Sequence, residues 1–95
     1  MLYYESALDD SNPQVRSYLL SVLGYIGPRA EDAIPDIIEA LEDENKQVRG
    51  QACYVLGKMG YKAHEATGSL IKLLDDGEPQ VRQNAAEALG NIGPL

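Results

Sequence analysis

The sequence predicts an all-α protein made of repeated helix pairs that stack on one another. The phrase NPQVR at Asn12–Arg16 recurs as NKQVR and then as EPQVR, each time 33 residues further on and without a gap. Within each interval the apolar residues follow helical spacing, and glycine and proline mark the places where helices should end. A unit of this length cannot bury its apolar face alone, so neighbouring units must cover each other.

The repeat divides the chain into residues 8–40, 41–73 and an incomplete 74–95, called units 1, 2 and 3 below. Residues 1–7 precede them and match the second helix of a unit in part. The units share matched columns, which are Leu8/Leu41/Leu74, Asp10/Asp43/Asp76, Gln14/Gln47/Gln80, Val15/Val48/Val81, Arg16/Arg49/Arg82, Leu23/Leu56/Leu89, Gly24/Gly57/Gly90 and Gly27/Gly60/Gly93.

Each unit opens with a first helix, the A helix. Its apolar residues are Val15, Leu19, Val22, Leu23 and Ile26 in unit 1, Val48, Ala52, Val55, Leu56 and Met59 in unit 2, and Val81, Ala85, Ala88, Leu89 and Ile92 in unit 3. Asn12 and Pro13 are typical of an N-cap and a first helical residue, and Glu78 with Pro79 repeats this device less well. Glycines then follow where a helix needs a left-handed closing residue, at Gly27, Gly60 and Gly93.

A second helix, the B helix, follows the closing glycines Gly27 and Gly60. Its apolar residues are Ala33, Ile37, Ile38 and Leu41 in unit 1, and Ala66, Leu70, Ile71 and Leu74 in unit 2. The inner glycines of the A helices, Gly24, Gly57 and Gly90, each cost about 1 kcal/mol relative to alanine in a helix. We therefore expect another helix to approach them closely.

Composition limits the classes of function. The 95 residues make one small domain, and 8 Lys+Arg against 15 Asp+Glu leave a net charge of −7. This charge repels polyphosphates and anionic lipid, so nucleic acid and membrane are poor partners. The single cysteine, Cys53, lies in a helical apolar pattern, and we expect it in the core of a protein from a reducing compartment, the cytoplasm.

The motif VR-x(5)-[VA]-LG-x-[IM]-G, the A-x(3)-[IL]-I-x(2)-L helix after it and the closing aspartate together resemble the short HEAT-like repeat named for phycobilisome lyases. The resemblance covers essentially the whole chain, whereas the TPLH-x-A phrase of ankyrin repeats, which share the period, is missing. It implies a right-handed α-solenoid of about three repeats, with A helices on the convex side and B helices on the concave side. It also implies that the chain acts mainly by holding another protein.

An acid and an arginine lie six residues apart in every unit, as Asp10 and Arg16, Asp43 and Arg49, and Asp76 and Arg82. In the repeat class that the sequence resembles, this pair forms a ladder of charge-assisted hydrogen bonds between stacked units. Because each arginine has its own acid in register, we expect a structural ladder here and not a phosphate site.

His64 and Glu65 suggest a metal hypothesis, since one HEAT-like family, the di-iron hydroxylases, binds metal through His-Glu pairs supplied by several repeats. Such a centre needs several pairs that converge. The chain has one histidine, and the matching A-helix positions hold Ser17-Tyr18, Gly50-Gln51 and Gln83-Asn84. We therefore expect no metal, no other cofactor and no catalytic residues.

Two surfaces are candidate sites for a protein partner. The concave face should carry the B-side residues outside the apolar stripe, which are Asp32, Asp36, Glu39, His64, Glu65, Ser69 and Lys72. It is mostly acidic, so a basic or polar segment is its natural guest. The outer face of the A helices carries Tyr18, Tyr25 and Tyr54, a residue type enriched at interfaces. An ordinary solvated surface is the alternative for both faces.

The incomplete units at the two ends indicate either an excerpt of a longer solenoid or ends that other chains cover. We expect the last A helix to present Val81, Ala85, Leu89 and Ile92 without a B-helix partner. The B-like start of one molecule could then dock on the last A helix of another in a head-to-tail contact.

These features predict a non-catalytic scaffold that binds a protein of unknown identity on the concave B-helix face. The alternative, which the name of the repeat family implies, is a subunit or domain that assists a tetrapyrrole (bilin) lyase.

Overall fold

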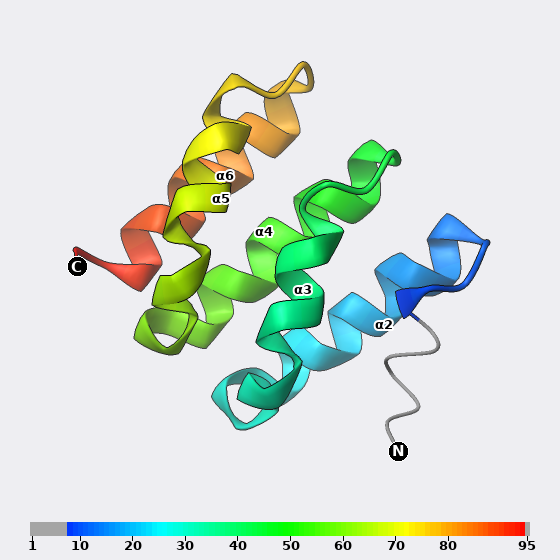
Figure 1. The fold of residues 1–95 in the computed structure, drawn as a ribbon, viewed down its shortest axis with the longest axis horizontal. Coiled ribbons are helices and arrows are strands. Elements are labelled where there is room, and N and C mark those ends of the chain that lie inside the picture. Colours follow the sequence, from blue (N-terminus) through cyan, green and yellow to red (C-terminus); the bar gives the residue numbers. More distant parts are fainter. Residues whose placement is uncertain (1–7, 95) are drawn as a thin grey trace.

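The computed structural model describes residues 8–94, and helices fill most of this range (Figure 1). Its α-helices and 3-10 helices (η) are α2 (Pro13–Ile26), η1 (Gly27–Ala33), α3 (Ile34–Ala40), α4 (Lys46–Met59), η2 (Gly60–Ala66), α5 (Thr67–Lys72), η3 (Leu73–Asp75) and α6 (Pro79–Ile92). None of the described residues lies in a strand, so the predicted all-α fold class is confirmed. The predicted partial B helix at 1–7 lies outside the described residues.

The helices form two layers (Figure 1). The A helices α2, α4 and α6 make one layer, in which α4 packs against both of its neighbours. The B helices make the other, and each packs against the A helix that follows it, α3 on α4 and α5 on α6. Units 1 and 2 therefore each contribute one helix to each layer and unit 3 contributes α6 to the A layer, which is the arrangement of an α-solenoid.

Asparagine side chains fix the start of two A helices. Asn12 accepts a hydrogen bond from the Gln14 amide, and Asn45 accepts one from the Gln47 amide, both at 2.8 Å. These bonds satisfy amides that the first turn of a helix leaves unpaired. Glu78 makes no such bond, so the third cap is the weakest, as the sequence predicts.

Each A helix ends at a glycine with positive φ, at 75° for Gly27, 63° for Gly60 and 88° for Gly93. Their ψ values of −146°, −145° and 176° place them in the extended region that glycine alone adopts, and not in the predicted left-handed helical region. After Gly27 and Gly60 the chain passes through a 3-10 segment that kinks at Ala30 or Ala63 before the B helix continues. Alanine carries no turn signal, so the sequence does not predict these segments.

The core lies between the two layers and runs through all three units. Its largest fully buried side chains are Leu20, Ile37, Leu41, Val48, Cys53, Val55, Leu56, Met59, Leu70 and Val81. The expected burial of Cys53 is confirmed, and burial is the main cause that raises the pKa of its thiol to about 12. The thiol is therefore protonated and inert at neutral pH.

Helix α2 departs from the predicted burial pattern. Val15, Val22 and Ile26 are 38%, 41% and 47% exposed, whereas the matched residues of α4 are at most 2% exposed. Helical spacing identifies the correct face of α4 because α2 covers that face, but none of the described helices packs in the corresponding place on α2. Leu20, which the predicted stripe omits, is fully buried.

The opposite end of the stack corrects a second expectation. Val81, Ala85 and Ile92 are buried, because these columns point back toward α4 and α5, and Leu89 is half-buried. The prediction that α6 presents them without a B-helix partner is therefore wrong. The large apolar residues exposed at this end are Ile71 and Leu74, on the last B-side segment.

Close helix packing accounts for two of the three inner glycines. A Cβ atom on Gly24 would lie 3.1 Å from Val55 Cγ2, and one on Gly57 would lie 3.1 Å from the Cα atom of Ala88. A Cβ atom on Gly90 would have no described neighbour within 4 Å. The expectation holds for the α2–α4 and α4–α6 contacts, while Gly90 faces open space.

This difference provides a matched test of the stacking. We predict that Gly57→Ala lowers the free energy of unfolding, because the Ala88 backbone must move, whereas Gly90→Ala raises it by up to about 1 kcal/mol through helix propensity alone. Urea denaturation of the two variants measures both changes. Equal changes at the two positions would contradict the tight contact between α4 and α6.

Candidate partner-binding site

A ladder of arginine–aspartate pairs joins the three units. The Arg16 guanidinium donates to both carboxylate oxygens of Asp43, from Nε at 2.8 Å and from Nη2 at 3.0 Å. Arg49 donates to Asp76 in the same way, at 2.9 and 3.1 Å. Each rung therefore connects an A helix to the turn that opens the next unit, through the paired geometry that a rigid guanidinium fork favours.

The spacing within a unit suggests that each arginine pairs with the carboxylate of the acid six residues before it. The structure shows a different role for that acid. The Nη1 atoms of the three arginines donate to the backbone carbonyls of these acids, from Arg16 to Asp10, Arg49 to Asp43 and Arg82 to Asp76. The carboxylates accept the amide two residues further on, which shapes the turn before each A helix. Arg16 and Arg49 thus pair with the carboxylate of the following unit, and all three arginines bind only the carbonyl of the acid in their own unit.

The ladder lowers the pKa of both of its aspartates. At Asp76 the hydrogen bonds from Arg49 are the main cause, and burial acts against them. At Asp43 burial is the largest single influence and raises the pKa, but the hydrogen bonds from Arg16 and from the Asn45 amide, together with the charges of Arg16 and Arg49, outweigh it. Both carboxylates are ionised at neutral pH, so the rungs are full ion pairs.

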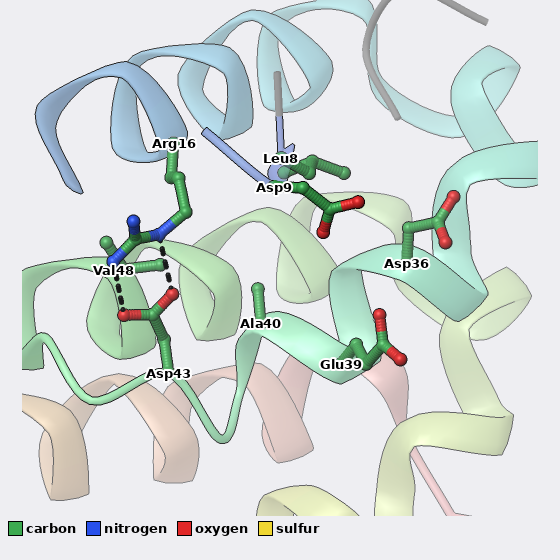
Figure 2. A pocket seen from close by; sticks show the side chains of 8 residues that line it. All are labelled: Leu8, Asp9, Arg16, Asp36, Glu39, Ala40, Asp43 and Val48. Carbon is green, nitrogen blue, oxygen red and sulfur yellow. Dashed lines mark hydrogen bonds and ion pairs between the residues drawn. The ribbon is translucent and has the colours of Figure 1, made fainter. Parts of the chain in front are cut away.

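A hollow of about 400 Å³ lies beside the first rung, between α3 and the start of the described chain (Figure 2). Its lining residues are Leu8, Asp9, Arg16, Asp36, Glu39, Ala40, Asp43 and Val48. Asp9 lies across from Asp36 and Glu39 of α3, and the Arg16–Asp43 pair forms one end. Since Asp43 already neutralises Arg16, the other three carboxylates set the potential of this acidic hollow.

The same position between units 2 and 3 has different chemistry. Asp36 and Glu39 correspond there to Ser69 and Lys72, so two carboxylates are lost and one ammonium group is gained. The same arginine–aspartate rung is present at both junctions. The acidic character of the first junction therefore comes from residues that the stacking does not require.

The other predicted B-side residues do not gather in the acidic hollow. His64 and Glu65 line a second, more open hollow of about 330 Å³, together with Glu31, Ile34, Tyr61 and Lys62. There the His64 ring stacks on Tyr61 with 4.9 Å between centroids, and Lys62 forms an ion pair with Glu31. The residues that line neither hollow are Asp32, Ser69 and Lys72.

The three predicted tyrosines lie on two helices. Tyr18 and Tyr25 of α2 are 75% and 95% exposed, and they lie on the same helix as the exposed Val15 and Val22. Tyr54 of α4 is half-exposed, and its ring lies 5.9 Å from the Lys58 ammonium group. Two of the tyrosines thus add to the exposed apolar face of α2.

Residues 8–94 contain no group of three or more His, Cys, Asp or Glu side chains that could hold a metal ion. Nor does any helix in this range have the length and apolar character needed to cross a bilayer.

A family model for HEAT repeats matches residues 4–90. The chain belongs to the HEAT-repeat family. HEAT repeats generally mediate protein–protein interaction, and the match is to this class of repeat as a whole, without separating the subtype named for phycobilisome lyases.

The crystal structure of an engineered protein is similar to this HEAT-repeat chain, with a TM-score of 0.79 and 23% sequence identity over 99% of this chain and 47% of that chain. At this identity the likeness shows the fold alone, and the chain spans about half the length of the engineered protein. No curated protein matches this HEAT-repeat chain.

Asp9 is the lining residue of the acidic hollow that sequence reasoning missed. It stands in a column with Glu42 and Asp75, so an acid precedes the ladder aspartate in every unit of this HEAT-repeat chain. That column is the available signal, but a repeated acid in an exposed turn is also what solvation favours. Asp9 and Asp36 are far apart in the sequence, and the fold brings both to the lining of one hollow.

We predict that the ladder makes the free energy of unfolding decrease at acid pH. A carboxyl group whose pKa is lowered on folding contributes stability above its unfolded pKa of about 4 and loses it as pH falls through the folded pKa. Thermal unfolding should therefore be insensitive to pH near neutrality and move to lower temperature below about pH 4. Asp76→Asn should cost about 1 kcal/mol at neutral pH and reduce the acid-dependent loss.

Asp75→Asn is the matched control, because Asp75 is the exposed neighbour outside the ladder. It should change neither the neutral stability nor its acid dependence. Equal losses in the two variants would contradict the assignment of the pH dependence to the rung.

Proposed function

We propose that this HEAT-repeat chain is a non-catalytic protein-binding scaffold, and that a basic segment of its partner binds the B-helix face at the acidic hollow. The observation that carries the proposal is the placement of Asp9, Asp36 and Glu39 around one hollow of about 400 Å³ beside the Arg16–Asp43 rung. In HEAT-like solenoids the B helices line the concave side, where an extended segment has the largest surface to contact.

A lysine or arginine side chain suits the acidic hollow in both size and charge. The apolar atoms of Leu8, Ala40 and Val48 can contact its aliphatic stem, while the carboxylates bind its charged end. A single exposed ion pair contributes little, so the proposal depends on several carboxylates acting on one cation. The net charge of −7 adds long-range attraction for a basic partner.

The rung gives the hollow a fixed wall. Arg16 is held by Asp43 and by the Asp10 carbonyl, so it is not free to turn into the hollow and neutralise the carboxylates there. A partner would therefore meet an arranged acidic site and would not have to displace an internal cation.

We predict that peptides selected from a random library on the immobilised chain are rich in lysine and arginine. The double variant Asp36→Ser, Glu39→Lys installs the residues of the next junction, and it should weaken binding of a selected peptide at least about tenfold by fluorescence anisotropy. The reciprocal variant Ser69→Asp, Lys72→Glu should add a second binding site at the junction of units 2 and 3.

The double variant Asp75→Ser, Glu87→Lys is the matched control, because it makes the same change in net charge outside the hollow. It should retain most of the affinity. Selected peptides without basic residues, or an equal loss in the control, would contradict binding at the acidic hollow.

A further inference from the structure

We infer that the end face of α6 binds the end face of α2 in a second copy of the chain, in the same register that joins consecutive units within one copy. The end face of α6 is formed by Arg82, Gln83, Ala86, Leu89 and Gly90. The end face of α2, with the turn before it, is formed by Asp10, Val15, Tyr18, Val22 and Ile26. The two helices lie at opposite edges of the A layer (Figure 1), and all of these side chains are exposed or half-buried.

The charges of the two faces complement each other. Arg82 is the ladder arginine that has no carboxylate partner among residues 8–94, and it donates to the Asp76 carbonyl. Asp10 is the ladder aspartate that has no arginine partner in the same range, and its carboxylate accepts the Asn12 amide. One period beyond Asp76, the aspartate column continues with Asp10 of a second copy. A rung from Arg82 to that residue would repeat the two rungs within the chain.

The glycine column gives a second match in the same register. Within the chain, an inner glycine receives a residue of the next A helix at two contacts, which are Gly24 with Val55 and Gly57 with Ala88. Gly90 is the third glycine of the column and has no described neighbour in this place. The column of Val55 and Ala88 begins at Val22, which is 41% exposed. The shared register therefore sets Val22 of the second copy on Gly90.

The other apolar and polar residues of the two end faces also match each other. Val15 and Ile26 match columns that are buried in α4 and α6 by the preceding A helix, and Ala86 and Leu89 of the first copy would cover Val15 and Ile26 of the second. Tyr18 stands in the column of Gln51 and Asn84, which both donate hydrogen bonds back to the preceding A helix. In the inferred contact the Tyr18 hydroxyl would lie beside Gln83 and Glu87.

Such a contact joins different faces, so each added copy leaves one free α2 face and one free α6 face. Assembly then either grows as a filament or closes as a ring. The contact uses the ends of the A layer, and it does not depend on what binds at the acidic hollow.

Sedimentation velocity of the full chain over a concentration series tests the inference. The wild type should gain mass with concentration, while Arg82→Asp and Asp10→Arg should each weaken association at least about tenfold, because each places like charges at the rung. Mixing the two charge variants should restore association, since each now offers the face that the other needs. Gly90→Leu should also block it, and Lys58→Asp, which makes the same charge change on α4, should not.

Circular dichroism checks that each variant retains the helical content of the wild type. If a charge variant fails to fold, Gly90→Leu still tests the inference. It should fold, because a Cβ atom at Gly90 would have no described neighbour within 4 Å. A wild type that stays monomeric up to about 1 mM overturns the inference. So does association that survives Gly90→Leu, or a mixture of two folded charge variants that fails to associate.

Discussion

A unit of this chain can bury its apolar face only against a neighbouring unit, and the burial, the ladder and the close helix contacts of the structure depend on that constraint. α4 has its core residues fully buried because α2 and α6 cover it on both sides, whereas the equivalent valines of α2 are two-fifths exposed. The same sequence columns therefore give different burial in different units. The burial of a residue therefore depends on the helix that covers it as much as on its own side chain.

The arginine–aspartate rung fixes the register in which neighbouring units meet. Apolar contact between helices is non-directional, and by itself it would tolerate a rotation or a shift of one helix along another. Arg16 and Arg49 remove that freedom, since each binds two carboxylate oxygens of the next unit and a backbone carbonyl of its own turn. Gly24 and Gly57 then allow the A helices to approach at the distance that the rung sets.

Because the rung is the same at each junction, the surface beside it is free to vary. The first junction carries Asp36 and Glu39, the second carries Ser69 and Lys72, and the backbone arrangement is shared. The proposed binding of a basic segment therefore depends on a few side chains placed on an invariant frame. This is how a repeat scaffold can acquire a specific partner without a change in fold.

Local signals in the sequence predicted the parts of the fold that local chemistry controls. Asn12 caps α2 and Gly27 ends it because the hydrogen bonds of the first turn and the positive φ of the last residue each depend on one side chain. The resemblance implied a ladder between units, but the spacing within one unit does not identify Asp43 as the partner of Arg16 or place Asp9 in one hollow with Asp36, since both arrangements depend on how units pack. The exposure of Val15 and the burial of Val81 were missed for the same reason, because spacing identifies a helical face but not which neighbour covers it.

The most direct test of this dependence is circular dichroism of residues 41–73 as an isolated peptide, compared with the full chain under the same conditions. We predict that the single unit has little helical signal and no cooperative melting transition, while the full chain melts cooperatively. A single unit that is strongly helical and melts cooperatively as a monomer would contradict the claim that contacts between units, and not within them, stabilise this fold.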